Sequence, residues 1–178
     1  MPSDLPELRR HLFLTGEKQV GKSTLLRRLM EQRGIECTGF ETRVFYADHE
    51  RRGFTLHGRV EMPPYRNDCI CCARIEQKRS VPVLPVFEEN GVLILQKSLS
   101  SSAPFILMDE LGKLESQAHE FVSQVYACLN SDKRVIGVLQ KCDSPHVAQI
   151  MQRHDVTVLT VTPENREQLL AQLLNCFC

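Results

Sequence analysis

A glycine-rich stretch near the N-terminus constrains the fold of this chain more than any other part of its sequence. The stretch is Gly16-Glu17-Lys18-Gln19-Val20-Gly21-Lys22-Ser23, and it matches the phosphate-binding loop pattern at every fixed position. The apolar residues 11–15 before it predict a strand, and the spacing of leucines in Lys22–Gln32 after it predicts an amphipathic helix. Because this pattern requires a strand before it and a helix after it, the chain is expected to be an α/β protein that binds a phosphate group.

The residue types of this loop suit a nucleotide. The glycines let backbone N–H groups turn towards a β-phosphate, and the helix N-terminus adds partial positive charge. Lys22 is expected to reach the β- and γ-phosphates, and the Ser23 hydroxyl is expected to ligate Mg²⁺. The predicted nucleotide-binding residues are Gly16, Glu17, Lys18, Gln19, Val20, Gly21, Lys22, Ser23 and Thr24.

An acidic pair follows a second apolar run. Phe105–Met108 predicts a fully buried strand, which ends on Asp109 and Glu110. Asp109 is predicted to hold Mg²⁺ with Ser23, since a phosphate loop needs an acid at the end of another core strand. Glu110 is predicted to be catalytic with Lys22, by orienting or deprotonating a water that attacks the γ-phosphate. Two alternatives remain: both acids end a strand in a solvated turn, or Glu110 has a structural or coupling role.

Short apolar runs alternate with helix-length amphipathic segments, which is typical of a mainly parallel sheet with helices on both faces. Residues 1–178 are interpreted as one domain. Segments 37–46 and 54–60 predict an antiparallel hairpin insertion around a charged turn, and Val92–Leu95 is short enough for a buried strand. The stretch at about 61–81 is rich in Pro, Cys and charge, so it predicts an irregular excursion outside the sheet.

Composition excludes several classes of protein. No run approaches the roughly 18 apolar residues of a membrane span, and the N-terminus lacks an apolar signal region, so a cytoplasmic protein is expected. The 22 Lys and Arg residues balance the 22 Asp and Glu residues, which argues against bulk electrostatic binding of nucleic acid. In a cytosolic chain of this size, the 8 cysteines are interpreted as thiols or metal ligands rather than disulfides.

Two weaker motifs favour a GTPase as an alternative. Asp109-Glu110-Leu111-Gly112 fits the Asp-x-x-Gly switch, and Gln140-Lys141-Cys142-Asp143 resembles a guanine-binding motif with Gln in place of Asn. Gln140 could equally sense a γ-phosphate from the end of its strand. A GTPase-like sheet would pair the Phe105–Met108 strand directly with the first strand. The Asp-Glu pair instead predicts that Arg134–Leu139 is inserted between them.

The motifs occur in the order seen in the THEP1-like nucleoside-triphosphatases, which this chain resembles over its whole length. They are the phosphate loop, Gly39-Phe40-Glu41-Thr42, Arg51-Arg52-Gly53-Phe54, Asp109-Glu110-Leu111-Gly112-Lys113-Leu114-Glu115 and Val161-Thr162-Pro163-Glu164-Asn165-Arg166. The resemblance implies a three-layer RecA-like P-loop fold. It also implies Mg²⁺-dependent hydrolysis of nucleoside triphosphates, such as ATP or GTP, with little base selectivity.

The resemblance leaves the cysteine cluster unexplained. Cys69, Cys71 and Cys72 either bind Zn²⁺ or another soft metal, with Cys37 or His57 as a fourth ligand, or remain reduced thiols. Arg51 or Arg52 either supplies a transition-state arginine or belongs to a solvated charged hairpin. The remaining histidines, namely His11, His49, His119, His146 and His154, are interpreted as solvated or capping residues.

The sequence therefore predicts hydrolysis of nucleoside triphosphates to diphosphate and phosphate, in a protein without membrane or nucleic-acid partners. One alternative is a nucleotide-gated switch or metallochaperone-like accessory protein, in which slow hydrolysis resets the cysteine loop. Another is a small-molecule kinase, since the same loop serves phosphoryl transfer to an acceptor.

Overall fold

The computed structural model describes residues 5–63, 68–75 and 79–177, with the backbone alone described for 68–75 and 79. Its strands form one 8-stranded sheet in the order β5-β4-β3-β2-β6-β7-β1-β8. They are β1 (His11–Thr15), β2 (Cys37–Ala47), β3 (Glu50–Gly58), β4 (Asp68–Ile75), β5 (Arg79–Pro82), β6 (Phe105–Leu111), β7 (Arg134–Leu139) and β8 (Val156–Thr160).

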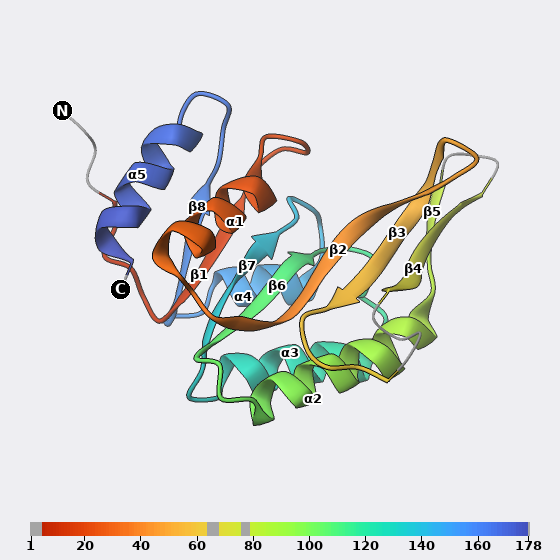
Figure 1. Cartoon of the computed structure of the whole chain (residues 1–178). Coiled ribbons are helices and arrows are strands. Elements are labelled where there is room, and N and C mark those ends of the chain that lie inside the picture. The colour runs from red at the N-terminus through yellow and green to blue at the C-terminus, as the bar shows by residue number, and fades with distance from the viewer. Residues whose placement is uncertain (1–4, 64–67, 76–78, 178) are drawn as a thin grey trace.

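The sheet has a parallel part and an antiparallel part. Strands β2, β6, β7, β1 and β8 pair in parallel, whereas β3, β4 and β5 extend β2 in antiparallel register. Figure 1 shows the long β2–β3 hairpin projecting to the upper right, with β4 and β5 beside it. The predicted hairpin is confirmed, but its turn is tighter than expected: Asp48 and His49 have positive φ values of 52° and 61°, which is the backbone of a type I′ turn.

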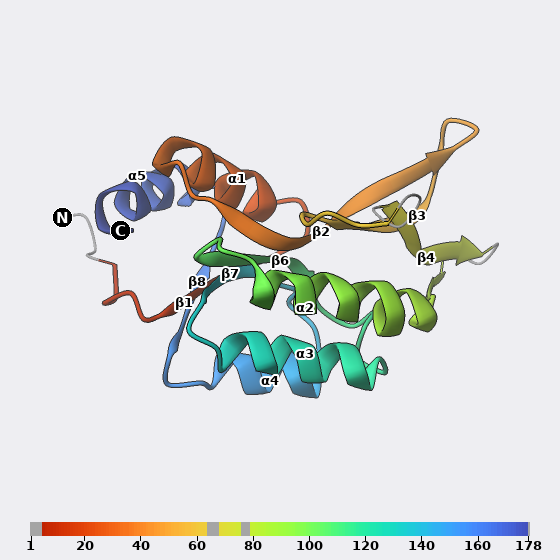
Figure 2. The same ribbon diagram turned by 60° about the horizontal axis from the view of Figure 1, so that its bottom comes forward.

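Helices cover both faces of the parallel part, so the predicted three-layer fold is confirmed. One face carries α1 (Lys22–Arg33) and α5 (Arg166–Cys176). The other carries α2 (Val92–Ser100), α3 (His119–Leu129) and α4 (Pro145–Met151), as Figure 2 shows. A π-helical turn, η1 (Val86–Gly91), leads directly into α2.

Strand β6 illustrates why the sheet needs both layers. Ile106 and Met108 belong to the apolar cluster under α2, α3 and α4, whereas Leu107 belongs to the cluster under α1 and α5. Successive side chains of a strand point to opposite faces, so a fully apolar strand loses contact with water only between two helical layers.

Strand β7 pairs with β6 on one side and with β1 on the other. The predicted insertion of Arg134–Leu139 between the acidic strand and the first strand is therefore confirmed. The direct pairing expected of a GTPase-like sheet does not occur, and this finding removes the sequence-based case for that alternative.

Two expectations from local sequence were wrong. Within 61–81, the backbone of β4 and β5 joins the sheet instead of leaving it, and Cys69, Cys71 and Cys72 lie on β4. Proline is disfavoured inside a central strand, but it is tolerated on an edge strand. Strand β5 lies at the edge of the sheet, and Pro82 is its last residue. The run Val92–Leu95 lies in α2 rather than in a strand, because four apolar residues carry too little periodicity to separate the two.

None of the helices in the described segments is long and apolar enough to cross a membrane.

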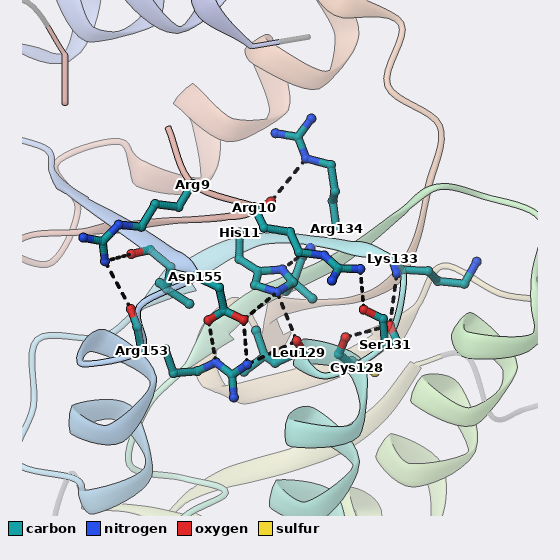
Figure 3. Close-up of polar contacts among 12 residues, drawn as sticks. Arg9, Arg10, His11, Cys128, Leu129, Ser131, Lys133, Arg134, Arg153 and Asp155 are labelled. Atoms are coloured by element: carbon teal, nitrogen blue, oxygen red, sulfur yellow. Dashed lines mark hydrogen bonds and ion pairs between the residues drawn. The ribbon is translucent and has the colours of Figure 1, made fainter. Parts of the chain in front are cut away.

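His11 is the first residue of β1, so it lies at the opposite end of that strand from the glycine-rich loop. Its side chain links several elements there, and its polar contacts are drawn in Figure 3. Its ring is fully buried, which corrects the expectation of a solvated side chain. Nδ1 accepts the Val135 N–H at 3.0 Å, so Nε2 carries the proton and donates to the Leu129 carbonyl at 3.1 Å. One neutral imidazole thus joins the start of β1 to the start of β7 and the end of α3.

Burial lowers the pKa of His11 from 6.5 to about 4, and the nearby Arg10 and Arg153 guanidinium groups act in the same direction, while Asp155 opposes them. At pH values between about 4 and 6.5, the unfolded chain therefore binds a proton at His11, whereas the folded chain leaves this residue neutral. The free energy of unfolding should therefore fall as pH drops from 6.5 towards 4, by at most about 1.4 kcal/mol per pH unit from this residue.

We expect the stability difference between wild type and His11→Gln to shrink across this window, as measured by urea denaturation at a series of pH values. The matched control is His154→Gln at an exposed position, which should change the free energy of unfolding at neutral pH by less than about 0.5 kcal/mol. Parallel profiles for wild type and His11→Gln would contradict the assignment.

Candidate functional site

The glycine-rich loop curls between β1 and α1. Gly16 and Gly21 have φ values of +139° and +98°, a region that side chains disfavour. A Cβ on Gly16 would also lie 2.3 Å from the carbonyl oxygen of Val161. Lys22 is buried, and its Nζ donates to the carbonyls of Gly16 and Glu17 at 3.0 and 2.7 Å, so its ammonium is held across the mouth of the loop.

The predicted Mg²⁺ ligands lie together. Ser23 Oγ, in the first turn of α1, donates to Asp109 Oδ1 on β6 at 2.9 Å. Thr42 Oγ1 of β2 donates to the Asp109 carbonyl at 3.3 Å, so the Gly-Phe-x-Thr segment steadies the acidic strand. A hydroxyl and a carboxylate beside a phosphate-binding loop are hard oxygen donors of the kind that Mg²⁺ prefers. The donor set therefore fits this ion.

Asp109 and Glu110 have separate surroundings, although they are adjacent. The register of β6 against β7 shifts between Asp109 and Leu111, and such a bulge interrupts the alternation of side chains. Burial raises the pKa of Asp109 to about 6, with the Ser23 hydrogen bond acting in the opposite direction. Burial also raises the pKa of Glu110, which makes this carboxylate a stronger base than an exposed one.

A cleft of about 920 Å³ lies over the loop. It is lined by loop residues and Glu110, by residues of β3 and β5, and by the segment after β6. Of the predicted nucleotide-binding residues, Lys18, Gln19, Gly21, Lys22, Ser23 and Thr24 line it. Glu17 instead forms an exposed ion pair, at 2.6 Å, with Lys141, which lines the cleft.

Gln140 stands at the end of β7 and faces this cleft. Its side-chain Oε1 accepts the Lys113 N–H at 3.2 Å, and its own N–H donates to the Leu111 carbonyl at 2.7 Å. Gln140 therefore orients the turn after the acidic strand.

The two candidate arginines separate in the structure. Arg51 lines the cleft, whereas Arg52 forms an ion pair with Glu50 on the exposed surface of the hairpin, at 3.2 Å. Arg166, to which sequence analysis gave no role, also lies close to the loop. Its Nη1 is 3.7 Å from the position that a Cβ on Gly21 would take.

A buried polar chain supports the segment after β6, and sequence analysis missed it. Ser144 Oγ lies 2.9 Å from His146 Nδ1, and His146 Nε2 lies 3.1 Å from Glu115 Oε1. The Gly112 N–H donates to the same Glu115 oxygen. A carboxylate only accepts, so His146 Nε2 donates to Glu115.

His146 is therefore a buried positioning residue rather than a solvated one, whereas His49, His119 and His154 are exposed as expected. The sequence feature that could have predicted this burial is the position of His146 on the apolar face of α4, beside Val147 and Ile150.

The side chains of Cys69, Cys71 and Cys72 fall outside the described residues, so the Zn²⁺ hypothesis stays a prediction. In the backbone register, Cys69 is opposite Leu56, which in turn is opposite Thr42 on β2. Cys37 precedes Thr42 by five residues on β2, which separates their backbones by about 16 Å at a strand's rise per residue. The Cys37 thiol contacts Met30 Sδ at 3.6 Å. His57 is opposite Asp68 in the backbone register, beside Cys69 along β4. Among the described side chains, no three His, Cys, Asp or Glu residues form a metal-binding group.

The sheet order and the loop at the carboxyl end of β1 define the class: this is a RecA-like P-loop NTPase fold. A family model described as NTPase matches residues 11–174, and the chain belongs to that NTPase family.

Named relatives agree with this assignment. The nucleoside-triphosphatase THEP1 of Thermotoga sp. (strain RQ2) is 30% identical over 177 residues, covering 92% of this chain and 93% of that protein. The human cancer-related nucleoside-triphosphatase is 31% identical over 188 residues, covering 94% and 96%.

Two solved structures share the fold. The crystal structure of THEP1 from Aquifex aeolicus superposes with a TM-score of 0.72 at 24% identity, covering 93% of this chain and 97% of that one. The solution structure of the human nucleoside triphosphatase gives a TM-score of 0.68 at 28% identity, covering 94% and 96%.

The His146–Glu115 pair should matter for stability. His146→Ala removes a hydrogen-bonded partner from a buried carboxyl group, so we expect the free energy of unfolding to fall by about 3 kcal/mol in urea denaturation. The matched control is His119→Ala at an exposed position, which should change stability by less than about 0.5 kcal/mol. Equal stabilities for the two variants would show that the pair contributes nothing.

Proposed function

We propose that this chain hydrolyses the bond between the β- and γ-phosphates of nucleoside triphosphates, with Mg²⁺ and with little preference for the base. The observation that carries the proposal is the shared cleft: Lys22, Ser23 and Glu110 all line it, and Asp109 is hydrogen-bonded to Ser23 at 2.9 Å. One binding face thus combines a phosphate cradle, an oxygen pair for the ion and a carboxylate of raised pKa.

Each group has a task in this reaction. Lys22 Nζ is held by two carbonyls of the loop, and in the proposed complex it donates to β- and γ-phosphate oxygens instead. Glu110 accepts a proton from the attacking water as the water oxygen bonds to the γ-phosphorus. The bridging oxygen then leaves with the diphosphate. Ser23 and Asp109 would hold Mg²⁺, which neutralises developing phosphate charge when it is bound.

Broad base tolerance is supported by where the specific contacts lie. In the proposed complex, backbone groups of the loop and Lys22 contact the phosphates, which all nucleoside triphosphates share. Gln140, the counterpart of a guanine-binding Asn, already has its side-chain oxygen bonded to the Lys113 N–H. Both relatives described above carry the name nucleoside-triphosphatase, which specifies no base.

Lys22→Ala tests the phosphate site. Because the γ-phosphate loses its main compensating charge, hydrolysis should fall to background and nucleotide affinity should weaken. Phosphate release would be measured with ATP, GTP, CTP and UTP, with and without Mg²⁺. Wild type should hydrolyse all four within about tenfold of one another, and the control Lys97→Ala, at an exposed position on α2 outside the cleft, should retain turnover. Unchanged turnover in Lys22→Ala would overturn the proposal.

Glu110→Gln tests the catalytic base. The amide keeps the size of the side chain but accepts no proton, so kcat should fall by about 10²-fold or more while Mg²⁺–nucleotide affinity stays within a few fold. Turnover kinetics and fluorescent-nucleotide binding separate the two effects. Glu61→Gln on the exposed surface should match wild type in both. A variant that loses affinity but keeps kcat would make Glu110 a ligand instead.

A further inference from the structure

Arg51 enters the cleft from outside the P-loop core. It comes from β3, in the antiparallel extension, and it lines the same cleft as Lys22 and Glu110. Its guanidinium carbon lies 4.6 Å from the centre of the Phe54 ring, which also lines the cleft. A planar guanidinium over an aromatic face is held by cation–π attraction, and this leaves the edge that carries its N–H groups available for other partners.

The Nε atom of Arg51 is an anomaly in this structure. It is buried and has no hydrogen-bond partner among the described residues. An unsatisfied buried donor costs free energy, so such a group is expected to have a purpose. The neighbouring Arg52 lacks this feature, since it pairs with Glu50 at the surface.

Among the side chains that the structure describes, the other cations of the cleft are already engaged or solvated. Lys22 bonds the loop carbonyls, and Lys141 pairs with Glu17 at 2.6 Å. Lys18 and Lys113 are exposed, so water screens their charges. Of these described cations, Arg51 combines partial burial, a side chain packed on an aromatic ring and a buried Nε–H without a hydrogen-bond partner. Its charge is therefore available, in addition to that of Lys22, to a ligand within the cleft.

We propose that Arg51 is a catalytic residue: a transition-state arginine that the β2–β3 hairpin supplies to the γ-phosphate of the same chain. The inference rests on the proposed hydrolysis. As the water oxygen bonds to the γ-phosphorus and the bond to the bridging oxygen breaks, Glu110 takes the water proton and negative charge grows on the phosphate oxygens. The guanidinium donates hydrogen bonds to those oxygens and neither gains nor loses a proton, because Arg stays charged.

Two consequences follow from this assignment. The flat, forked guanidinium can bind two phosphate oxygens together, whereas a lysine ammonium acts as a point charge, so lysine should replace Arg51 poorly. The arginine comes from the same chain as the phosphate loop, so activity per molecule should not depend on protein concentration.

The test compares Arg51→Ala and Arg51→Lys with the control Arg52→Ala in the full-length protein. Both Arg51 variants should lower kcat by about 10²-fold or more, while Arg52→Ala stays near wild type. Binding of Mg²⁺–ADP alone should change by less than a few fold in all three. Binding of Mg²⁺–ADP with aluminium fluoride, which mimics the transferring phosphoryl group, should be lost in the Arg51 variants only. Thermal melts establish that each variant is folded.

The outcomes separate this inference from the proposed function. If wild type turns over, Lys22→Ala does not, and Arg51→Ala matches Arg52→Ala, then hydrolysis stands and the Arg51 role is overturned. Equal loss of Mg²⁺–ADP and of the aluminium fluoride complex would also overturn it, because Arg51 would then be a ground-state ligand. If wild type hydrolyses no nucleotide, both proposals fall. Specific activity that rises with protein concentration would assign the arginine to a second molecule and overturn supply from the same chain.

Discussion

Burial of the parallel strands on both faces is the constraint on which the rest of this structure depends. Strands β1, β6 and β7 are apolar at nearly every position, so they are stable only between two layers of helices. The helices that return the chain from each strand to the next bring all the carboxyl ends to one edge of the sheet. The loop after β1 and the acids after β6 consequently meet, and the contact between Ser23 and Asp109 is the result.

Buried polar contacts fix both ends of these strands. At the amino end of β1, His11 joins β1, β7 and the end of α3 through two ring nitrogens, and Figure 3 shows its contact with Leu129. Near the cleft, Glu115 receives hydrogen bonds from His146 and from the Gly112 backbone. Since the cost of losing a buried hydrogen bond is high, each network holds its segments in a single arrangement. The cleft thus rests on a rigid support, as a preorganised site requires.

The antiparallel extension, β3 to β5, contributes residues to the lining of the cleft. The core contributes the phosphate loop, the acids and Gln140, whereas β3 and β5 contribute Arg51, Phe54, Ser80 and Pro82. Strand pairing holds this extension in register with β2, and Thr42 of β2 contacts the backbone of Asp109. The hairpin is therefore connected to the acidic strand by a direct hydrogen bond, and the extension belongs to the site.

The sequence by itself determined the phosphate loop, the acidic strand and the hairpin, because each has a local pattern that buried strands and tight loops enforce, and the Asp-Glu pair that ends the acidic strand also predicted the order β6-β7-β1. Tertiary structure decided the rest. It placed β4 and β5 in the sheet, since edge pairing depends on a neighbouring strand rather than on local periodicity. It also buried His11 and His146, whose partners are 118 and 31 residues away along the chain. Arg51 and Arg52 are adjacent in sequence, and only the position of β3 against the cleft distinguishes the arginine that faces the phosphate loop from the one that faces water.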